Sequence, residues 1–218
     1  MNKNNLAIWA LVLVVIIGAL LYWRGQSDGM ASESPTTASP FTDVLVTPEV
    51  ETTGTTSAPA LKSPTPNIEH SVVFSSGIKS EQQSYILASV EKARLALRAD
   101  NKNFDAWIDL ANSASAAGDT RYAIEILKFV SLNVPQFGLA ECNMGTIYGY
   151  HAHDNVSAEA HYRTALAREP NVLYCWVETY QFFIDTDQTA KARAILKQGI
   201  DLKVKDYAKL QTILDQTP

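Results

Sequence analysis

The sequence predicts an all-α protein in which a membrane-spanning helix, a disordered linker and a C-terminal array of paired antiparallel helices follow one another. Three observations lead to this prediction. An 18-residue run near the N-terminus carries no charge, the next stretch is rich in Thr, Ser and Pro, and the remainder shows a helical period that recurs about every 35 residues. The composition, 46% apolar and 19% charged, suits a chain with one packed core.

Residues 6–23 form the uncharged run, and a short tail at residues 1–5 precedes it. A helix of this length spans roughly 27 Å at about 1.5 Å per residue, close to the hydrocarbon thickness of a bilayer. Trp9 and Tyr22 lie near its ends, where aromatic rings prefer the headgroup layer. The alternative is a cleaved signal peptide, but this run is longer than the usual apolar core of such peptides. We therefore expect an uncleaved single-pass anchor.

The orientation of this anchor is weakly specified, because Lys3 and Arg24 lie on opposite sides of it. A short polar tail stays easily in the cytoplasm, and the stretch that follows has the composition of an extracytoplasmic stalk. We therefore expect the repeat domain to be extracytoplasmic. The net charge of -5 offers no basic surface for nucleic acid, so we expect protein partners.

Residues 24–79 are predicted to be a Thr/Ser/Pro-rich linker. Tracts such as SESPTTASP and TTGTTSAP bury too little apolar surface to offset the entropy lost on ordering. As a flexible coil, such a linker would extend roughly 40 Å root-mean-square. Residues 44–46 and 72–74 are apolar interruptions, and each is a candidate for a short strand or a docking segment.

Helical periodicity defines a domain at residues 80–218, which begins with a capping helix at 81–99. Ser80 is the expected N-cap, with Gln83 three residues later completing a capping box. Apolar residues then recur at steps of three and four along one expected face: Tyr85, Ile86, Val90, Ala93 and Leu97.

Three copies of a helical pattern follow at about 104–137, 138–172 and 173–205. The first has Trp107, Leu110, Ala111, Ala114, Gly118, Asp119, Ala123, Leu127 and Pro135. The second has Met144, Gly145, Tyr148, Ala158, Tyr162, Ala165 and Pro170, with one extra residue in the turn near 151–155. The third is weaker, with Trp176, Tyr180, Phe183, Ala192, Leu196 and Gly199, and with Asp187 where the turn glycine belongs. In spacing and residue type these copies resemble the tetratricopeptide repeat.

This resemblance implies an α-solenoid in which the consensus residues pack the repeats together and a helix at 206–216 caps the end. It also implies a concave groove lined by the first helix of each repeat. Carried over by repeat position, the groove residues are Asp105, Ile108, Asn112, Ser115, Cys142, Thr146, Gly149, Tyr174, Val177, Gln181 and Ile184. None is basic, so capture of a C-terminal carboxylate is not expected; an apolar or neutral peptide, or another helix, fits better.

Other residue groups receive simpler interpretations. Cys142 and Cys175 are expected to be buried thiols rather than a disulfide. His151, His153, Asp154 and His161 lack the spacing of a zinc site, and we expect neither a metal nor another cofactor. No catalytic motif is recognisable, so we do not expect an enzyme. Among the aromatic residues of the third copy, Tyr174 and Phe182 are candidates for an exposed sticky patch.

The sequence therefore favours a membrane-tethered adaptor or scaffold that mediates protein–protein interaction in the cell envelope. The partner would bind in the repeat groove, and the membrane would be bound through residues 6–23. One alternative is a self-associating structural module, which would make the protein a homo-oligomer. Another, resting on analogy, is an accessory subunit of an envelope assembly or translocation machine.

Overall fold

The computed structural model describes residues 61–217, and the regular secondary structure within them is entirely helical, which confirms the all-α prediction for this part of the chain. The helices are α2 (Ser80–Ala99), α3 (Phe104–Ala117), α4 (Thr120–Asn133), α5 (Gly138–Thr146), the π-helical turn η1 (Ile147–His151), α6 (Asn155–Arg168), α7 (Leu173–Asp185), α8 (Thr189–Asp201) and α9 (Tyr207–Gln216). The anchor predicted at residues 6–23 lies outside the described residues. Within 61–217, no helix is both long and apolar enough to cross a membrane.

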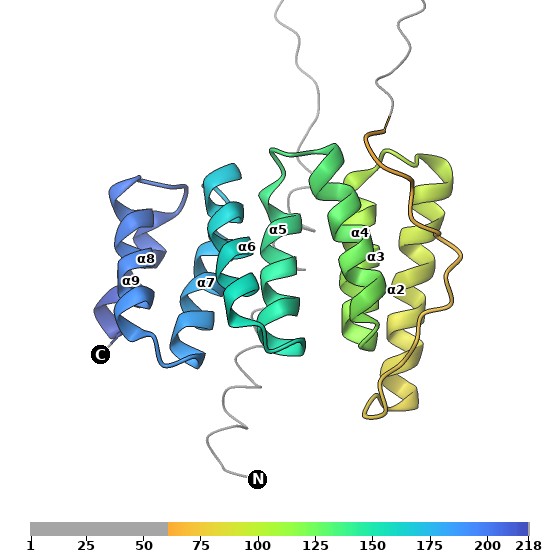
Figure 1. Cartoon of the computed structure of the whole chain (residues 1–218), viewed down its shortest axis with the longest axis horizontal. Coiled ribbons are helices and arrows are strands. Elements are labelled where there is room, and N and C mark those ends of the chain that lie inside the picture. The colour runs from red at the N-terminus through yellow and green to blue at the C-terminus, as the bar shows by residue number, and fades with distance from the viewer. Residues whose placement is uncertain (1–60, 218) are drawn as a thin grey trace, which may run out of the picture. The chain divides into compact units, whose positions relative to one another are not determined.

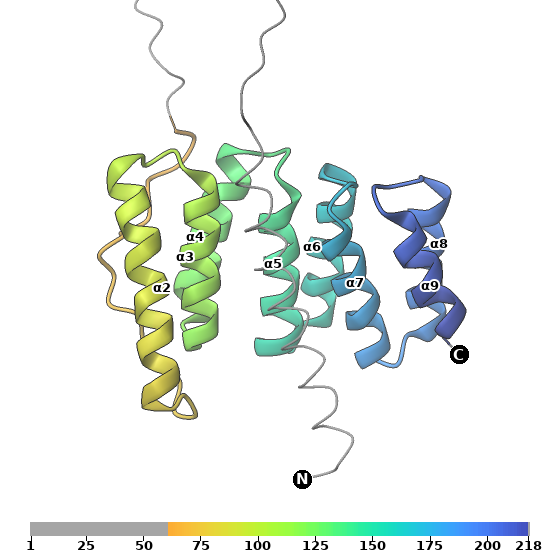
Figure 2. The ribbon, with the colours of Figure 1, turned by 180° about the vertical axis from the view of Figure 1, so that it is seen from behind.

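Successive helices pack on one another in a row that runs from α2 to α9 (Figures 1 and 2). Helices α3 and α4, α5 and α6, and α7 and α8 form three consecutive pairs, and α2 and α9 flank them. The buried side chains form two clusters, one centred on α2 to α4 and the other on α6 to α9. Leu139 and Tyr148 contact both clusters. This arrangement is compatible with a helical repeat fold.

Two tryptophans reveal equivalent positions in the first and third pairs. Trp107 and Trp176, 69 residues apart in the sequence, are both fully buried. The indole N–H of Trp107 donates to the backbone carbonyl of Asn101 at 3.0 Å, and that of Trp176 donates to the carbonyl of Pro170 at 2.7 Å. Both bonds reach back six residues. The two helix pairs therefore build the same local environment at an offset of 69 residues.

The turn inside each pair has the same backbone conformation. Gly118 (φ 88°), His153 (φ 53°) and Asp187 (φ 57°) all adopt the left-handed region. Glycine enters this region without a steric penalty, whereas other residues enter it less readily. Position 187 thus keeps the turn geometry although aspartate replaces the glycine of the repeat pattern.

The extra residue of the second pair is absorbed by the π-helical turn η1, slightly earlier than the predicted turn. A π-helical turn holds one more residue than an α-helical turn and is a common way to accommodate an insertion. Gly149 lies in this turn, and a Cβ atom there would be 3.1 Å from the ring of Phe182. The insertion therefore allows η1 to pack closely against α7.

Ordered packing replaces the predicted coil at residues 61–79. This segment, here called the strap and drawn in orange in Figure 1, lies along α2 and α4. Leu61, Ile68 and Val72 are partly buried against the first cluster. These three apolar side chains, together with the hydrogen bonds of the strap's backbone, supply the burial that its polar composition alone would not predict. Val72 belongs to the segment at 72–74 for which docking was one alternative.

The start of α2 differs from the prediction by one residue. Lys79 is the N-cap, and its backbone N–H donates to the Gln82 side chain at 3.1 Å, so Ser80 and Gln83 do not form the capping box. Tyr85 is 70% exposed and does not belong to the buried face. Ile86, four residues before Val90, lies on that face instead.

Candidate functional site: the face of α3, α5 and α7

The first helices of the three pairs are joined by polar contacts on one face. Asn143 of α5 donates to the side chain of Asn112 of α3 at 2.8 Å. Tyr150 of η1 donates to Asp185 of α7 at 2.8 Å. We call this surface the groove face; polar contacts join α3 to α5 and η1 to α7.

Nine of the eleven predicted groove residues are exposed or half-buried, and two are buried. Asp105, Asn112, Gln181 and Tyr174 are exposed, whereas Ser115, Thr146, Gly149, Val177 and Ile184 are half-buried. Ile108 and Cys142 are buried, and their assignment to an open groove was wrong. Ile108 packs in the first cluster because α2 and α4 both cover α3. Cys142 belongs to the second cluster, where α5 meets α7.

Carboxylates that sequence reasoning missed give the face an acidic character. Asp109, Glu178 and Asp185 join Asp105 there, and within residues 61–217 none of the four forms an ion pair. A signal for one contact was present in the sequence. Tyr150 and Asp185 are 35 residues apart, one repeat, so a comparison of adjacent copies could have placed them side by side.

Burial raises the pKa of two of these carboxyl groups. For Glu178, burial is the largest cause, the nearby hydroxyl of Thr146 opposes it, and the charge of Asp185 raises the pKa further. Asp109 is more exposed, but partial desolvation of its carboxyl group is again the largest cause; Lys92 partly compensates, and Asp105 adds repulsion. A cationic or hydrogen-bond-donating ligand would relieve both penalties.

Asp185 is held in place by two donors. The Tyr150 hydroxyl and the Gln181 amide each donate to it at 2.8 Å. Partial burial and the neighbouring Asp185 raise the pKa of Tyr150, so its hydroxyl remains a donor at neutral pH. The carboxylate is therefore oriented before any partner arrives.

The predicted sticky patch is reduced to one residue. Phe182 is buried, 5.3 Å from the ring of Tyr162, and its assignment to an exposed patch was wrong. The insertion at η1 brings Gly149 against it and closes its surroundings. Tyr174 remains 41% exposed.

Cys142 and Cys175 are buried free thiols, as the sequence predicts. Burial raises the pKa of Cys142, and the neighbouring Cys175 raises it further. A thiol that resists ionisation is a poor nucleophile.

A buried polar cluster links α4, α5 and α6. The Glu141 carboxylate accepts from Ser131 at 2.6 Å, from His161 at 2.7 Å and from Arg168 at 2.8 Å. Burial would raise the pKa of Glu141, but these partners outweigh it and hold the pKa below its usual value. Ser131 is bonded to the carboxylate and not to the imidazole, so the cluster lacks the Ser–His contact of nucleophilic catalysis. The geometry of the cluster is that of a structural contact between α4, α5 and α6.

His151, His153, Asp154 and His161 do not gather around a common point. His161 is bound to Glu141, and Asp154 caps α6 by accepting from the Ser157 backbone at 3.0 Å. Among the described residues, no three His, Cys, Asp or Glu side chains form a group suited to a metal ion.

Comparison with known proteins adds no further assignment. No family model matches the sequence, and no curated protein matches it significantly.

Proposed function

We propose that this chain is a membrane-tethered adaptor whose tetratricopeptide-like array binds a protein partner on the groove face. The observation that carries the proposal is the polar face on which side chains of α3 and α5, and of η1 and α7, are hydrogen-bonded to one another. Protein-binding helical arrays use such faces because a ligand can contact several repeats at once. The uncharged run at residues 6–23 supplies the tether and places the array in the cell envelope.

The chemistry of the face defines the kind of ligand expected. Exposed Asn112 and Gln181 offer amide donors and acceptors, and Tyr174 offers an aromatic surface. Glu178 and Asp185 add unpaired negative charge, which opposes an acidic ligand. We therefore expect a neutral or cationic peptide segment, with a donor or cation placed over Glu178.

The first test is a crosslinking pull-down from intact membranes with the full chain and with a version that ends at residue 79. The proposal requires a partner protein that is captured only when residues 80–218 are present. A partner captured equally by both forms would bind outside the array and would contradict the proposal.

The second test places a cation on the face. Asn112→Arg and Gln181→Arg are each expected to reduce capture of that partner at least tenfold, because each adds bulk and positive charge where the ligand lies. Gln211→Arg is the matched control, since Gln211 of α9 donates to Asp215 at 2.7 Å as Gln181 donates to Asp185 at 2.8 Å. Unchanged capture by both groove variants would remove the groove face from the proposal.

A second candidate function is self-association, and one observation favours it. Tyr85 and Leu95 on α2 are 70% and 63% exposed, and Leu87 is 45% exposed. Apolar side chains on a terminal helix of an array can be covered by another copy. A mass that rises with protein concentration and is lowered by Tyr85→Ser with Leu95→Ser would support this function. A concentration-independent monomer would exclude it.

A further inference from the structure

The strap shows how the flanking helix α2 and the second helix of the first pair, α4, can hold an extended chain. Its Asn67 carbonyl accepts from the Tyr122 hydroxyl at 2.6 Å. His70 Nε2 lies 2.8 Å from the Asp119 carboxylate, which also accepts from the Val73 N–H at 3.1 Å. Asn133 accepts from the Lys62 N–H at 2.7 Å. The partners of the strap on α4 are thus Asp119, Tyr122 and Asn133.

Two arginines of α2 also contact the strap. Arg94 donates to the backbone carbonyl of His70. Arg98 pairs with the Glu69 carboxylate at 2.8 Å. Backbone and side-chain contacts therefore come from both helices that flank the strap.

The equivalent surface lies between α6 and α8, at the offset of 69 residues that relates the two tryptophans, and keeps only the first of the two arginines. Added to the five strap-binding residues, this offset gives Arg163, Ala167, Gln188, Lys191 and Leu202 in place of Arg94, Arg98, Asp119, Tyr122 and Asn133. Each of the five lines one of two adjoining hollows between α6 and α8, with volumes of about 440 and 220 Å³. We call these two hollows the trough.

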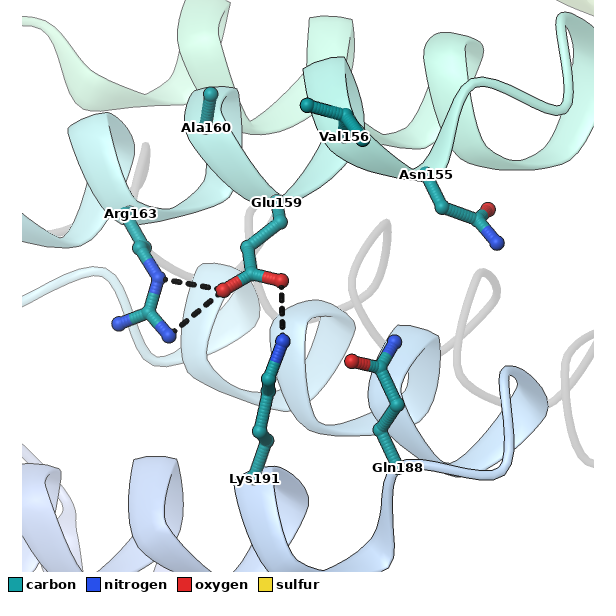
Figure 3. A pocket seen from close by; sticks show the side chains of 7 residues that line it. All are labelled: Asn155, Val156, Glu159, Ala160, Arg163, Gln188 and Lys191. Atoms are coloured by element: carbon teal, nitrogen blue, oxygen red, sulfur yellow. Dashed lines mark hydrogen bonds and ion pairs between the residues drawn. The ribbon is translucent and has the colours of Figure 1, made fainter.

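Figure 3 shows the first hollow of the trough. Glu159 lies between two cations, with its carboxylate 2.8 Å from Arg163 and 2.8 Å from Lys191. Burial would raise the pKa of Glu159, but the hydrogen bonds from Lys191 and Arg163 outweigh it and lower the pKa. The Arg163 and Lys191 side chains remain 52% and 46% exposed. Both cationic side chains therefore have N–H groups that a ligand can reach. The charges of Glu159, Arg163 and Lys191 together give one net positive charge.

We propose that the trough between α6 and α8 binds an extended acidic peptide segment of a partner protein, in the way that α2 and α4 bind the strap. Arg163 stands where Arg94 donates to a backbone carbonyl, and the same role is assigned to it. The trough lies on different helices from the groove face. The proposal therefore does not depend on the proposed function.

The preference for an acidic ligand follows from two positions at which the trough differs from the surface that binds the strap. In that surface, the residues at both positions contact His70. Asp119 and Tyr122 hold the His70 imidazole by a hydrogen bond and by ring contact at 4.1 Å. At the equivalent points the trough has the neutral amide of Gln188 and the cation of Lys191. A carboxylate at this position of the ligand would gain an ion pair with Lys191. An imidazole there would lack the hydrogen bond that Asp119 makes with His70.

The test compares two fluorescent peptides by anisotropy with the full chain. One carries residues 65–73, TPNIEHSVV, and the other carries the same sequence with His70→Glu. The Glu peptide is expected to bind at least tenfold more tightly, and Lys191→Glu is expected to remove this advantage. Lys197→Glu is the matched control, because Lys197 is exposed on α8 outside the trough.

A gain of affinity separates binding from misfolding. Glu159→Gln removes the carboxylate that competes for both cations and is expected to tighten binding of the Glu peptide several-fold. Equal affinity of the two peptides, equal effects of Lys191→Glu and Lys197→Glu, or no binding of the Glu peptide at millimolar concentration would each overturn the proposal. Displacement of the strap from α2 and α4 by a peptide would also overturn the proposal, since such binding does not involve Lys191.

Discussion

At the scale of single residues, small side chains determine how closely the helices approach. Gly145 of α5 lies against the fully buried ring of Tyr162 on α6, and a Cβ atom there would be 2.8 Å from the ring. Real Cβ atoms do not approach so closely, so any larger residue must displace the ring or the helix. The glycine of the repeat pattern is thus explained by one contact between α5 and α6.

Gly145→Ala is therefore expected to lower the free energy of unfolding by about 1–3 kcal/mol, the usual cost of overpacking a core. Gly77→Ala serves as the control, because a Cβ atom at Gly77 meets nothing within 4 Å. Urea denaturation of both variants checks the prediction. Equal stability of the two would show that α5 and α6 can separate without cost.

At the scale of elements, the strap is held by a residue that also caps α4. The Asp119 carboxylate accepts from the Tyr122 N–H at 3.4 Å, as a capping residue does, and binds His70 and Val73 of the strap. Burial would raise the pKa of Asp119, but these bonds outweigh it and lower the pKa. Gly118 next to it leaves room for Ser75, whose Oγ would lie 1.8 Å from an added Cβ atom.

Asp119→Ala is expected to release the strap, which hydrogen exchange of residues 61–79 would detect as faster exchange. Loss of the cap itself costs about 1 kcal/mol. Asp154→Ala is the control, because Asp154 caps α6 in the same way without touching the strap. If both variants accelerate exchange in the strap equally, Asp119 does not hold it.

The lowered pKa of Asp119 also gives the strap a pH dependence. A carboxyl group with a depressed pKa in the folded state stabilises the fold above its unfolded pKa of about 3.9, and this contribution is lost as the pH falls through the folded value. Hydrogen exchange in the strap should therefore accelerate, relative to the rest of the array, only below about pH 4.

At the scale of the whole described array, stability is distributed over two buried clusters joined through α5. Leu127 in the first cluster and Leu196 in the second are both fully buried and lie 69 residues apart, at equivalent positions. Repeat arrays gain stability mainly from contacts between neighbours, so damage to one end need not spread to the other.

Leu127→Ala and Leu196→Ala are each expected to cost about 2–5 kcal/mol. Hydrogen exchange should accelerate mainly in α2 to α4 for the first variant and in α7 to α9 for the second. Uniform acceleration along residues 61–217 in both variants would show instead that the two clusters unfold as one unit.

The sequence by itself determined the helical class and the repeating pattern of residues 104–205, because small and aromatic residues at fixed spacing are local information. It also identified the buried Trp107 and Trp176. Tertiary structure decided the rest of the candidate surfaces. Ile108 and Cys142 are buried because helices on both sides cover them, and no single-helix pattern records a neighbour's position.

Charge placement was also a tertiary outcome. Tyr150 meets Asp185 only where η1 packs against α7, and Asp119 meets His70 only because the strap folds back over α4. A polar segment such as the strap resembles a linker in sequence, since the acceptor of the Lys62 N–H and the donor to the Asn67 carbonyl lie 71 and 55 positions away. Local propensity predicts the helices; long-range contacts determine which of their faces remain open to a partner.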